Sequence, residues 1–144
     1  MHGDLAENRS VIRVGGEDRE SFLQALVTND LGKLNEGLVY SALLTPQGKY
    51  LADFFLVPDP DAVEAIDRPV ARGVGDVPDT AFADPRDAEL GWRQYGTKPA
   101  SAAGIDWTAL RVAHAIPEPG SELIPEESYI LEFDFDRLNG VDFK

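Results

Sequence analysis

Apolar and polar residues follow periodic patterns in the N-terminal third of the chain. Residues 10–16, SVIRVGG, alternate between the two types and end in a glycine pair, which predicts a strand and a turn. Residues 17–30, EDRESFLQALVTND, begin with acidic residues and then place apolar residues at helical spacing, which predicts a helix. Its apolar positions are Phe22, Leu23, Leu26 and Val27.

Two further apolar stretches predict a β-hairpin. The segments LVYSALL (38–44) and KYLADFFLV (49–57) have the composition of strands, and TPQG lies between them. Proline and glycine favour a tight turn at that junction. The hairpin is therefore the clearest long-range feature that the pattern predicts.

The periodicity weakens after residue 57. Residues 58–89 are rich in proline, aspartate and glycine, which predicts an irregular connecting region, although about thirty residues without structure are long for a compact domain. Residues 90–96 predict a short strand, and residues 106–116 predict a helix. The expected buried positions of this helix are Trp107, Leu110, Val112 and Ala113. This order of elements predicts an α+β fold with a mixed or antiparallel sheet and helices packed on it.

Composition and charge narrow the classes of function. A chain of 144 residues is long enough for one domain with a hydrophobic core. Its 26 acidic and 13 basic residues give a net charge of −13, so we expect neither direct nucleic-acid binding nor membrane binding. The sequence has no cysteine and two histidines, and we predict no metal site and no catalytic residue. The absence of cysteine, and of a basic segment followed by an apolar one at the N-terminus, fits a cytoplasmic protein.

Asp53 is the candidate functional residue that the pattern singles out. Strict alternation along the second hairpin strand places it on one face with Leu51 and Phe55, while Tyr50 and Ala52 point to the other face. A carboxylate among apolar neighbours is costly to desolvate unless another group pairs with it. The alternative is that this face is half-exposed near a sheet edge.

The turn length decides which residue lies opposite Asp53. A four-residue loop pairs Leu44 with Lys49 and places Tyr40 opposite Asp53, which would suit a flat, nitrogen-rich heterocycle. A three-residue loop instead places Ser41 opposite Asp53, and Tyr40 then faces Phe54. Both registers remain open from the sequence.

Several blocks together resemble the YgfZ/GcvT folate-binding family. These blocks are FLQALVTND, the TPQGK turn, the aspartate five residues beyond its glycine, DPRDAELGWRQYG, LRVAHAIPEPGSEL and RLNGVDF. The family includes the glycine-cleavage aminomethyltransferase and relatives that assist iron–sulfur proteins and tRNA modification. The resemblance implies an aminomethyltransferase folate-binding-domain-like fold. It also implies that Asp53 and Tyr40 bind tetrahydrofolate or a derivative, with Asp53 accepting hydrogen bonds from the pterin and Tyr40 packing against it.

The sequence also departs from the family pattern. The transferase branch has a double aspartate after a double glycine, whereas this chain has Gly48-Lys49 and Ala52-Asp53. This difference favours the YgfZ-type branch, in which GVDF leads to a K-G-C-Y-x-G-Q-E signature that is absent here. The resemblance therefore implies a single partial domain over residues 1–144, in which a family segment is missing within 58–89 and the C-terminal part is absent.

Three functions follow as hypotheses. The first is a tetrahydrofolate-binding YgfZ-type protein that supports iron–sulfur cluster assembly or repair and has iron–sulfur proteins as clients. The second is a tetrahydrofolate-dependent aminomethyltransferase. The third is an inactive partial domain whose uncovered sheet face would favour a homo-oligomer.

Overall fold

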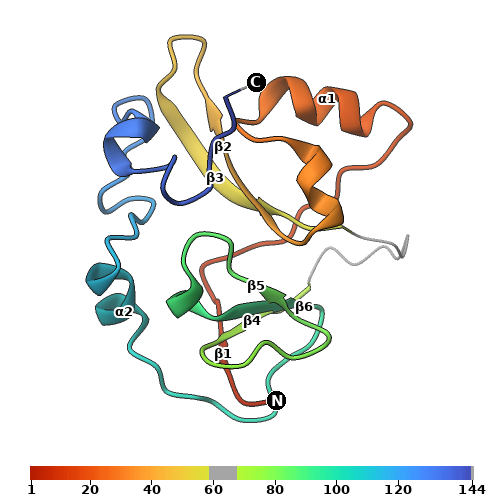
Figure 1. Ribbon diagram of the computed structural model, residues 1–144, viewed down its shortest axis with the longest axis vertical. Coiled ribbons are helices and arrows are strands. Elements are labelled where there is room, and N and C mark those ends of the chain that lie inside the picture. The colour runs from red at the N-terminus through yellow and green to blue at the C-terminus, as the bar shows by residue number, and fades with distance from the viewer. Residues whose placement is uncertain (59–67, 144) are drawn as a thin grey trace.

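The computed structural model describes residues 1–58 and 68–143, which form an α+β fold with antiparallel sheets (Figure 1). The fold class predicted from the sequence is therefore confirmed. The strands are β1 (Asp4–Leu5), β2 (Val39–Leu44), β3 (Tyr50–Leu56), β4 (Val70–Gly73), β5 (Phe82–Ala83) and β6 (Trp92–Tyr95). The α-helices are α1 (Arg19–Leu26) and α2 (Trp107–Ala113), and the 3-10 helices are η1 (Leu31–Asn35), η2 (Ala88–Leu90) and η3 (Ile130–Phe133).

The strands form two sheets that lie one above the other in Figure 1. The larger sheet has the order β1-β4-β6-β5, with antiparallel neighbours throughout. The smaller sheet is the predicted hairpin of β2 and β3. The segment that follows α2 runs from the larger sheet to the hairpin, so the C-terminal residues pack beside β2 and β3.

The hairpin register differs from both predicted registers. Asp53 lies opposite Ala42, and Tyr40 lies opposite Phe55. A register shift between Leu43 and Leu44 inserts one extra residue in β3, and this bulge is the physical reason for the difference. Tyr40 and Asp53 are therefore diagonal neighbours on one face instead of directly opposed residues.

The segment predicted as an irregular connection over residues 58–89 contains regular structure. Its described part forms β4, β5 and η2, and residues 59–67 lie outside the described residues. The strands are short, and β4 ends in Gly73, on which the ring of Trp92 packs. Short strands with a glycine and few alternating positions leave a weak sequence pattern, which explains why the prediction was wrong.

Two other predicted features were wrong in detail. Residues 10–14 form no strand, and Ile12 is 84% exposed. In the predicted helices, Phe22 of α1 and Val112 of α2 are exposed, and no residue of either helix is fully buried. Helical spacing placed these residues with apolar neighbours, but only part of each apolar face is covered: Leu23, Trp107 and Leu110 are half-buried, and Leu110 packs against the main core. The predicted homo-oligomer through an uncovered face stays a prediction.

The main core lies between the hairpin and the C-terminal segment. It contains Tyr40, Ala42, Tyr50, Leu90, Ile116, Leu123, Ile130, Phe135 and Leu138. Asn29, which is 1% exposed, donates hydrogen bonds to the carbonyl oxygens of Tyr40 and Asn139. Two blocks more than one hundred residues apart in the sequence, VTND and RLNG, are therefore joined directly at β2.

Candidate functional site

The carboxylate of Asp53 is fully buried and accepts two hydrogen bonds from tyrosines. The hydroxyl of Tyr40 donates to Oδ2 over 2.7 Å, and the hydroxyl of Tyr50 donates to Oδ1 over 2.7 Å. The side chain of Asp53 is 0% exposed. Tyr40 and Asp53 share one sheet face, as the four-residue loop would also have placed them, although their register is different. Two hydroxyl donors offset the desolvation of the carboxylate.

Tyr50 is the partner that strict alternation missed. The bulge in β3 interrupts the period of two between Tyr50 and Ala52, so Tyr50 reaches the face that holds Asp53. Its ring is 1% exposed. Burial, followed by the hydrogen bond with Asp53, raises the pKa of Tyr50 above its ordinary value. Tyr50 therefore stays protonated and remains a hydrogen-bond donor.

The ring of Tyr40 packs against two phenylalanine rings. Its centroid lies 5.2 Å from that of Phe135 in a stacked arrangement and 5.3 Å from that of Phe55. Gly140 allows the C-terminal segment to approach this ring, because a Cβ there would lie 2.7 Å from Phe135 and 3.0 Å from Tyr40. Burial, and then the charge of Asp53, raises the pKa of Tyr40.

Arg9 connects Asp53 to a neighbouring pocket. Its guanidinium lies 4.0 Å from Oδ2 of Asp53 and donates to the Asp53 carbonyl oxygen over 3.5 Å. Arg9 also lines a pocket of about 90 Å³. Neither Asp53 nor Tyr40 lines this pocket, so the carboxylate lies behind its wall.

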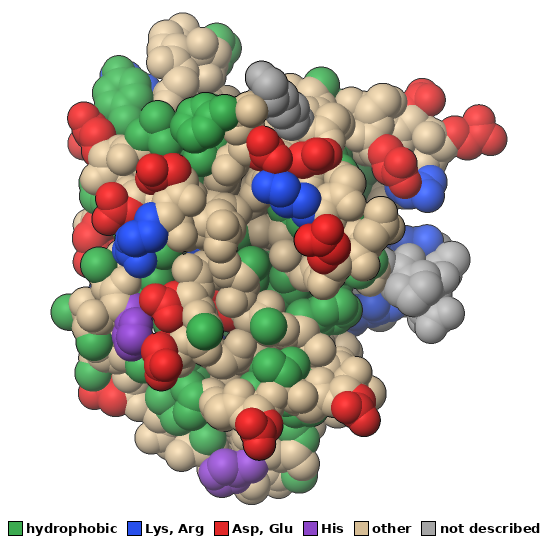
Figure 2. All heavy atoms as spheres, in the orientation of Figure 1, with side chains coloured by type: hydrophobic (Ala, Val, Ile, Leu, Met, Phe, Trp, Pro, Cys, Tyr) green, Lys and Arg blue, Asp and Glu red, His purple; other side chains and the backbone are tan. Residues whose placement is uncertain are grey.

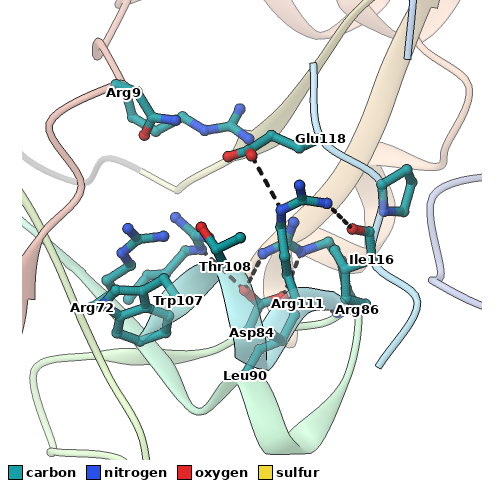
Figure 3. A pocket seen from close by; sticks show the side chains of 13 residues that line it. Arg9, Arg72, Asp84, Arg86, Leu90, Trp107, Thr108, Arg111, Ile116 and Glu118 are labelled. Atoms are coloured by element: carbon teal, nitrogen blue, oxygen red, sulfur yellow. Dashed lines mark hydrogen bonds and ion pairs between the residues drawn. The ribbon is translucent and has the colours of Figure 1, made fainter. Parts of the chain in front are cut away.

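Arginine side chains dominate the pocket lining (Figure 3). Five of the nine arginines of the chain contribute, and they come from the N-terminal segment, β4, β6, α2 and the loop before η2. They are Arg9, Arg72, Arg86, Arg93 and Arg111, and the acidic residues of the lining are Asp84 and Glu118. Figure 2 shows the opposite balance on the outer surface that it displays, where acidic side chains are scattered and basic ones are few.

Asp84 binds two of these arginines. Arg86 donates to its two carboxylate oxygens over 2.9 and 2.8 Å, and Nε of Arg93 donates over 3.1 Å. Burial by itself would raise the pKa of Asp84, but the hydrogen bonds and charges of the arginines outweigh it, and the pKa is lowered. The same contacts place the guanidinium of Arg86 5.4 Å from the ring of Tyr40. Arg86 is therefore a physical link between the pocket and the Asp53 site.

Sequence reasoning did not identify the arginines as a group. Asp84, Arg86 and Arg93 lie within the DPRDAELGWRQYG block that carried the family resemblance, so part of the signal was present. The spacing inside that block does not reveal that Arg9 and Arg111 join them. Their association depends on contacts between distant parts of the chain.

Comparison with known proteins gives one informative match. No protein-family model matches the chain. The iron–sulfur cluster assembly factor IBA57 homologue, a mitochondrial protein of Mycosarcoma maydis, is 21% identical over 197 residues. The chain is distantly similar to an iron–sulfur assembly factor. This similarity covers 95% of the chain and supports, at a coarse level, the resemblance to the YgfZ/GcvT family. The chain spans about half the length of this curated relative, 49%.

The described residues form neither a metal-binding cluster nor a membrane-spanning helix. Within residues 1–58 and 68–143, no group of three histidine, aspartate or glutamate side chains is placed to hold a metal ion. No helix in the described part of the chain is long and apolar enough to cross a membrane.

Proposed function

We propose that this chain is a tetrahydrofolate-binding protein of the YgfZ type that supports iron–sulfur cluster assembly or repair. The observation that carries the folate part is the buried carboxylate of Asp53, held by Tyr40 and Tyr50 beside an arginine-lined pocket. The similarity to an iron–sulfur cluster assembly factor supports the wider role. Folate binding and the iron–sulfur clients are both proposals for this chain.

The donor and acceptor chemistry of Asp53 fits the edge of a pterin ring. An ionised carboxylate accepts hydrogen bonds through two oxygens, and a pterin presents N–H groups that donate. At present the tyrosine hydroxyls supply those donors. A bound pterin would replace the hydroxyl of Tyr50, because the ring of Tyr40 is fixed between Phe55 and Phe135. Asp53 would thus exchange one donor for another without losing its hydrogen bonds.

Each residue would then have a distinct part in binding. Asp53 would accept hydrogen bonds from the heterocycle, and Tyr40 would keep its bond to Oδ2 and orient the carboxylate. Arg9 would hold the negative charge of Asp53 in place from the pocket side. These parts require binding and orientation by the chain and do not require a catalytic residue.

Titration with tetrahydrofolate under reducing conditions tests the proposal. We expect saturable binding to the wild-type chain and at least tenfold weaker binding to Asp53→Ala and Asp53→Asn. The matched control is Asp76→Asn, which removes one negative charge from an exposed turn and should leave the affinity unchanged. Circular dichroism of each variant establishes that it is folded. Equal affinity of the wild-type chain and folded Asp53→Asn would remove Asp53 from the site.

A further inference from the structure

The arginine-lined pocket contains one arginine, Arg72, that makes no ion pair with a carboxylate of the described residues. Asp84 pairs with Arg86 and Arg93, and Glu118 lies 3.1 Å from Arg111. Two carboxylates that do not line the pocket also approach its arginines: Asp53 lies 4.0 Å from Arg9, and Glu122 lies 3.1 Å from Arg111. Among the described residues, no carboxylate lies within ion-pair distance of Arg72, the remaining arginine of the lining.

The position of Arg72 in the sheet makes its charge costly. Arg72 of β4 lies directly opposite Arg93 of β6, and like charges at directly opposed positions destabilise a sheet. Burial, followed by the charge of Arg93, lowers the pKa of Arg72 to about 10. Burial, followed by the charge of Arg86, also lowers the pKa of Arg93. The pocket lining thus carries five arginines and two carboxylates in a chain whose net charge is −13.

The guanidinium of Arg72 packs on an aromatic ring, but its Nε has no hydrogen-bond partner among the described residues. It lies 4.2 Å from the centroid of the Trp107 ring, a cation–π contact that fixes its plane. Its Nε atom is buried, and no described group accepts a hydrogen bond from it. Trp107 is itself fixed, because its Nε1 donates to Asp4 over 2.9 Å. A buried donor without an acceptor is expensive and indicates a missing acceptor.

The dimensions of the pocket limit what that acceptor can be. On the same measure a single water needs about 10–15 Å³, so a pocket of about 90 Å³ holds several waters or one small ion. Part of the pocket wall is apolar and is formed by Leu90, Trp107 and Ile116. A volume of about 90 Å³ therefore has room for a compact oxyanion.

We propose that this pocket binds a small tetrahedral oxyanion of the inorganic phosphate type. Arginine guanidiniums suit such an ion because their planar N–H groups match pairs of oxyanion oxygens. Nε of Arg72 would donate a hydrogen bond to one oxygen of the ion. The negative charge of the ion would reduce the repulsion between Arg72 and Arg93. Arg9 belongs both to the pocket lining and to the surroundings of Asp53. Asp53 and Tyr40 do not line the pocket, so the variants at Arg72 test this site separately from the proposed folate site.

Binding of sodium phosphate, measured by calorimetry and by thermal unfolding, tests the proposal. Sodium chloride at equal ionic strength is the reference. We expect phosphate to raise the unfolding temperature of the wild-type chain, because it binds the folded state. In Arg72→Gln the affinity for phosphate should fall at least tenfold. Arg13→Gln removes the same charge from an exposed position and should bind phosphate as the wild type does.

One further variant and one further ligand complete the test of the phosphate site. Arg72→Lys retains the charge but loses Nε, so it should fold and bind phosphate more weakly than the wild type. Adenosine monophosphate should bind no more tightly than phosphate, and tighter binding would overturn the assignment of a free oxyanion. Phosphate that stabilises the wild type no more than chloride does, or equal affinity in folded Arg72→Lys and the wild type, would overturn the proposed site.

Discussion

The hydroxyl of Tyr40 donates a hydrogen bond over 2.7 Å to Oδ2 of Asp53, across two strands of a hairpin that places them diagonally. This contact explains how a carboxylate persists at 0% exposure on an apolar sheet face. The second donor, Tyr50, completes the arrangement because a β-bulge turns its ring to the same face. Asp53 is therefore an acceptor whose hydrogen bonds are supplied by two tyrosine hydroxyls, and the proposed folate site requires that one of these donors be replaced.

Tyr50→Phe should destabilise the protein by about 1.5–3 kcal/mol, because it removes a hydrogen bond to a buried charged group. Urea unfolding at pH 7 measures this change. Tyr129→Phe is the matched control, since the ring of Tyr129 is 43% exposed and its variant should stay within about 0.5 kcal/mol of the wild type. Equal stabilities for the two variants would mean that the Tyr50 hydroxyl contributes nothing to holding Asp53.

Gly140→Ala should destabilise the protein by about 1–3 kcal/mol through overpacking. The added Cβ would meet the rings of Phe135 and Tyr40 at 2.7 and 3.0 Å, and both rings belong to the core. Gly15→Ala is the control, because a Cβ at Gly15 would meet no atom within 4 Å. Chemical denaturation of both variants gives the comparison. A neutral Gly140→Ala would contradict the close packing of the C-terminal segment on Tyr40.

Asp4 should make stability depend on pH in the acid range. The backbone N–H groups of Ile105 and Gly104 are the largest causes that lower its pKa from 3.8 to about 2. A folded-state pKa below the unfolded value means that this contribution is complete above about pH 4 and is lost as the pH falls towards 2.

Acid titration of the unfolding temperature tests this expectation. Asp4→Asn should be less stable than the wild type at pH 7 and should show a shallower loss of stability between pH 4 and pH 2. The control Asp79→Asn removes an exposed carboxylate and should retain the steeper wild-type profile. Parallel profiles for the wild type and Asp4→Asn would show that Asp4 makes no pH-dependent contribution.

The sequence predicted those parts of the fold and site that depend on local pattern. Strand alternation and the TPQG turn were sufficient for the hairpin, and an aspartate among apolar residues was sufficient to select Asp53. The shared face of Tyr40 and Asp53 followed from one of two open registers, and the observed register is neither of them. The bulge that turns Tyr50 towards Asp53 contains no distinctive residue such as glycine. The alternation of apolar and polar residues therefore did not indicate a bulge.

Features that depend on distant contacts were not predictable from one sequence. Arg9, Arg72 and Arg111 lie on three separate segments, and each of them resembles an ordinary surface arginine when its neighbours in the sequence are considered alone. The strands β4 and β5 have four and two residues, which is too short for alternation to be recognised. Their formation follows from pairing with β6, and the burial of Trp92 against Gly73 fixes their position.

The measurement that tests the central claim most directly is a comparison of tetrahydrofolate affinity among the wild-type chain, Tyr50→Phe and Asp53→Asn. If a pterin replaces the Tyr50 hydroxyl at Asp53, removal of that hydroxyl eliminates a competing donor, and Tyr50→Phe should bind tetrahydrofolate more tightly than the wild type. Asp53→Asn should bind more weakly, because the charged acceptor is lost. Changes of opposite sign in two folded variants of one site are the predicted result. Equal affinities in all three proteins would contradict the proposed role of Asp53.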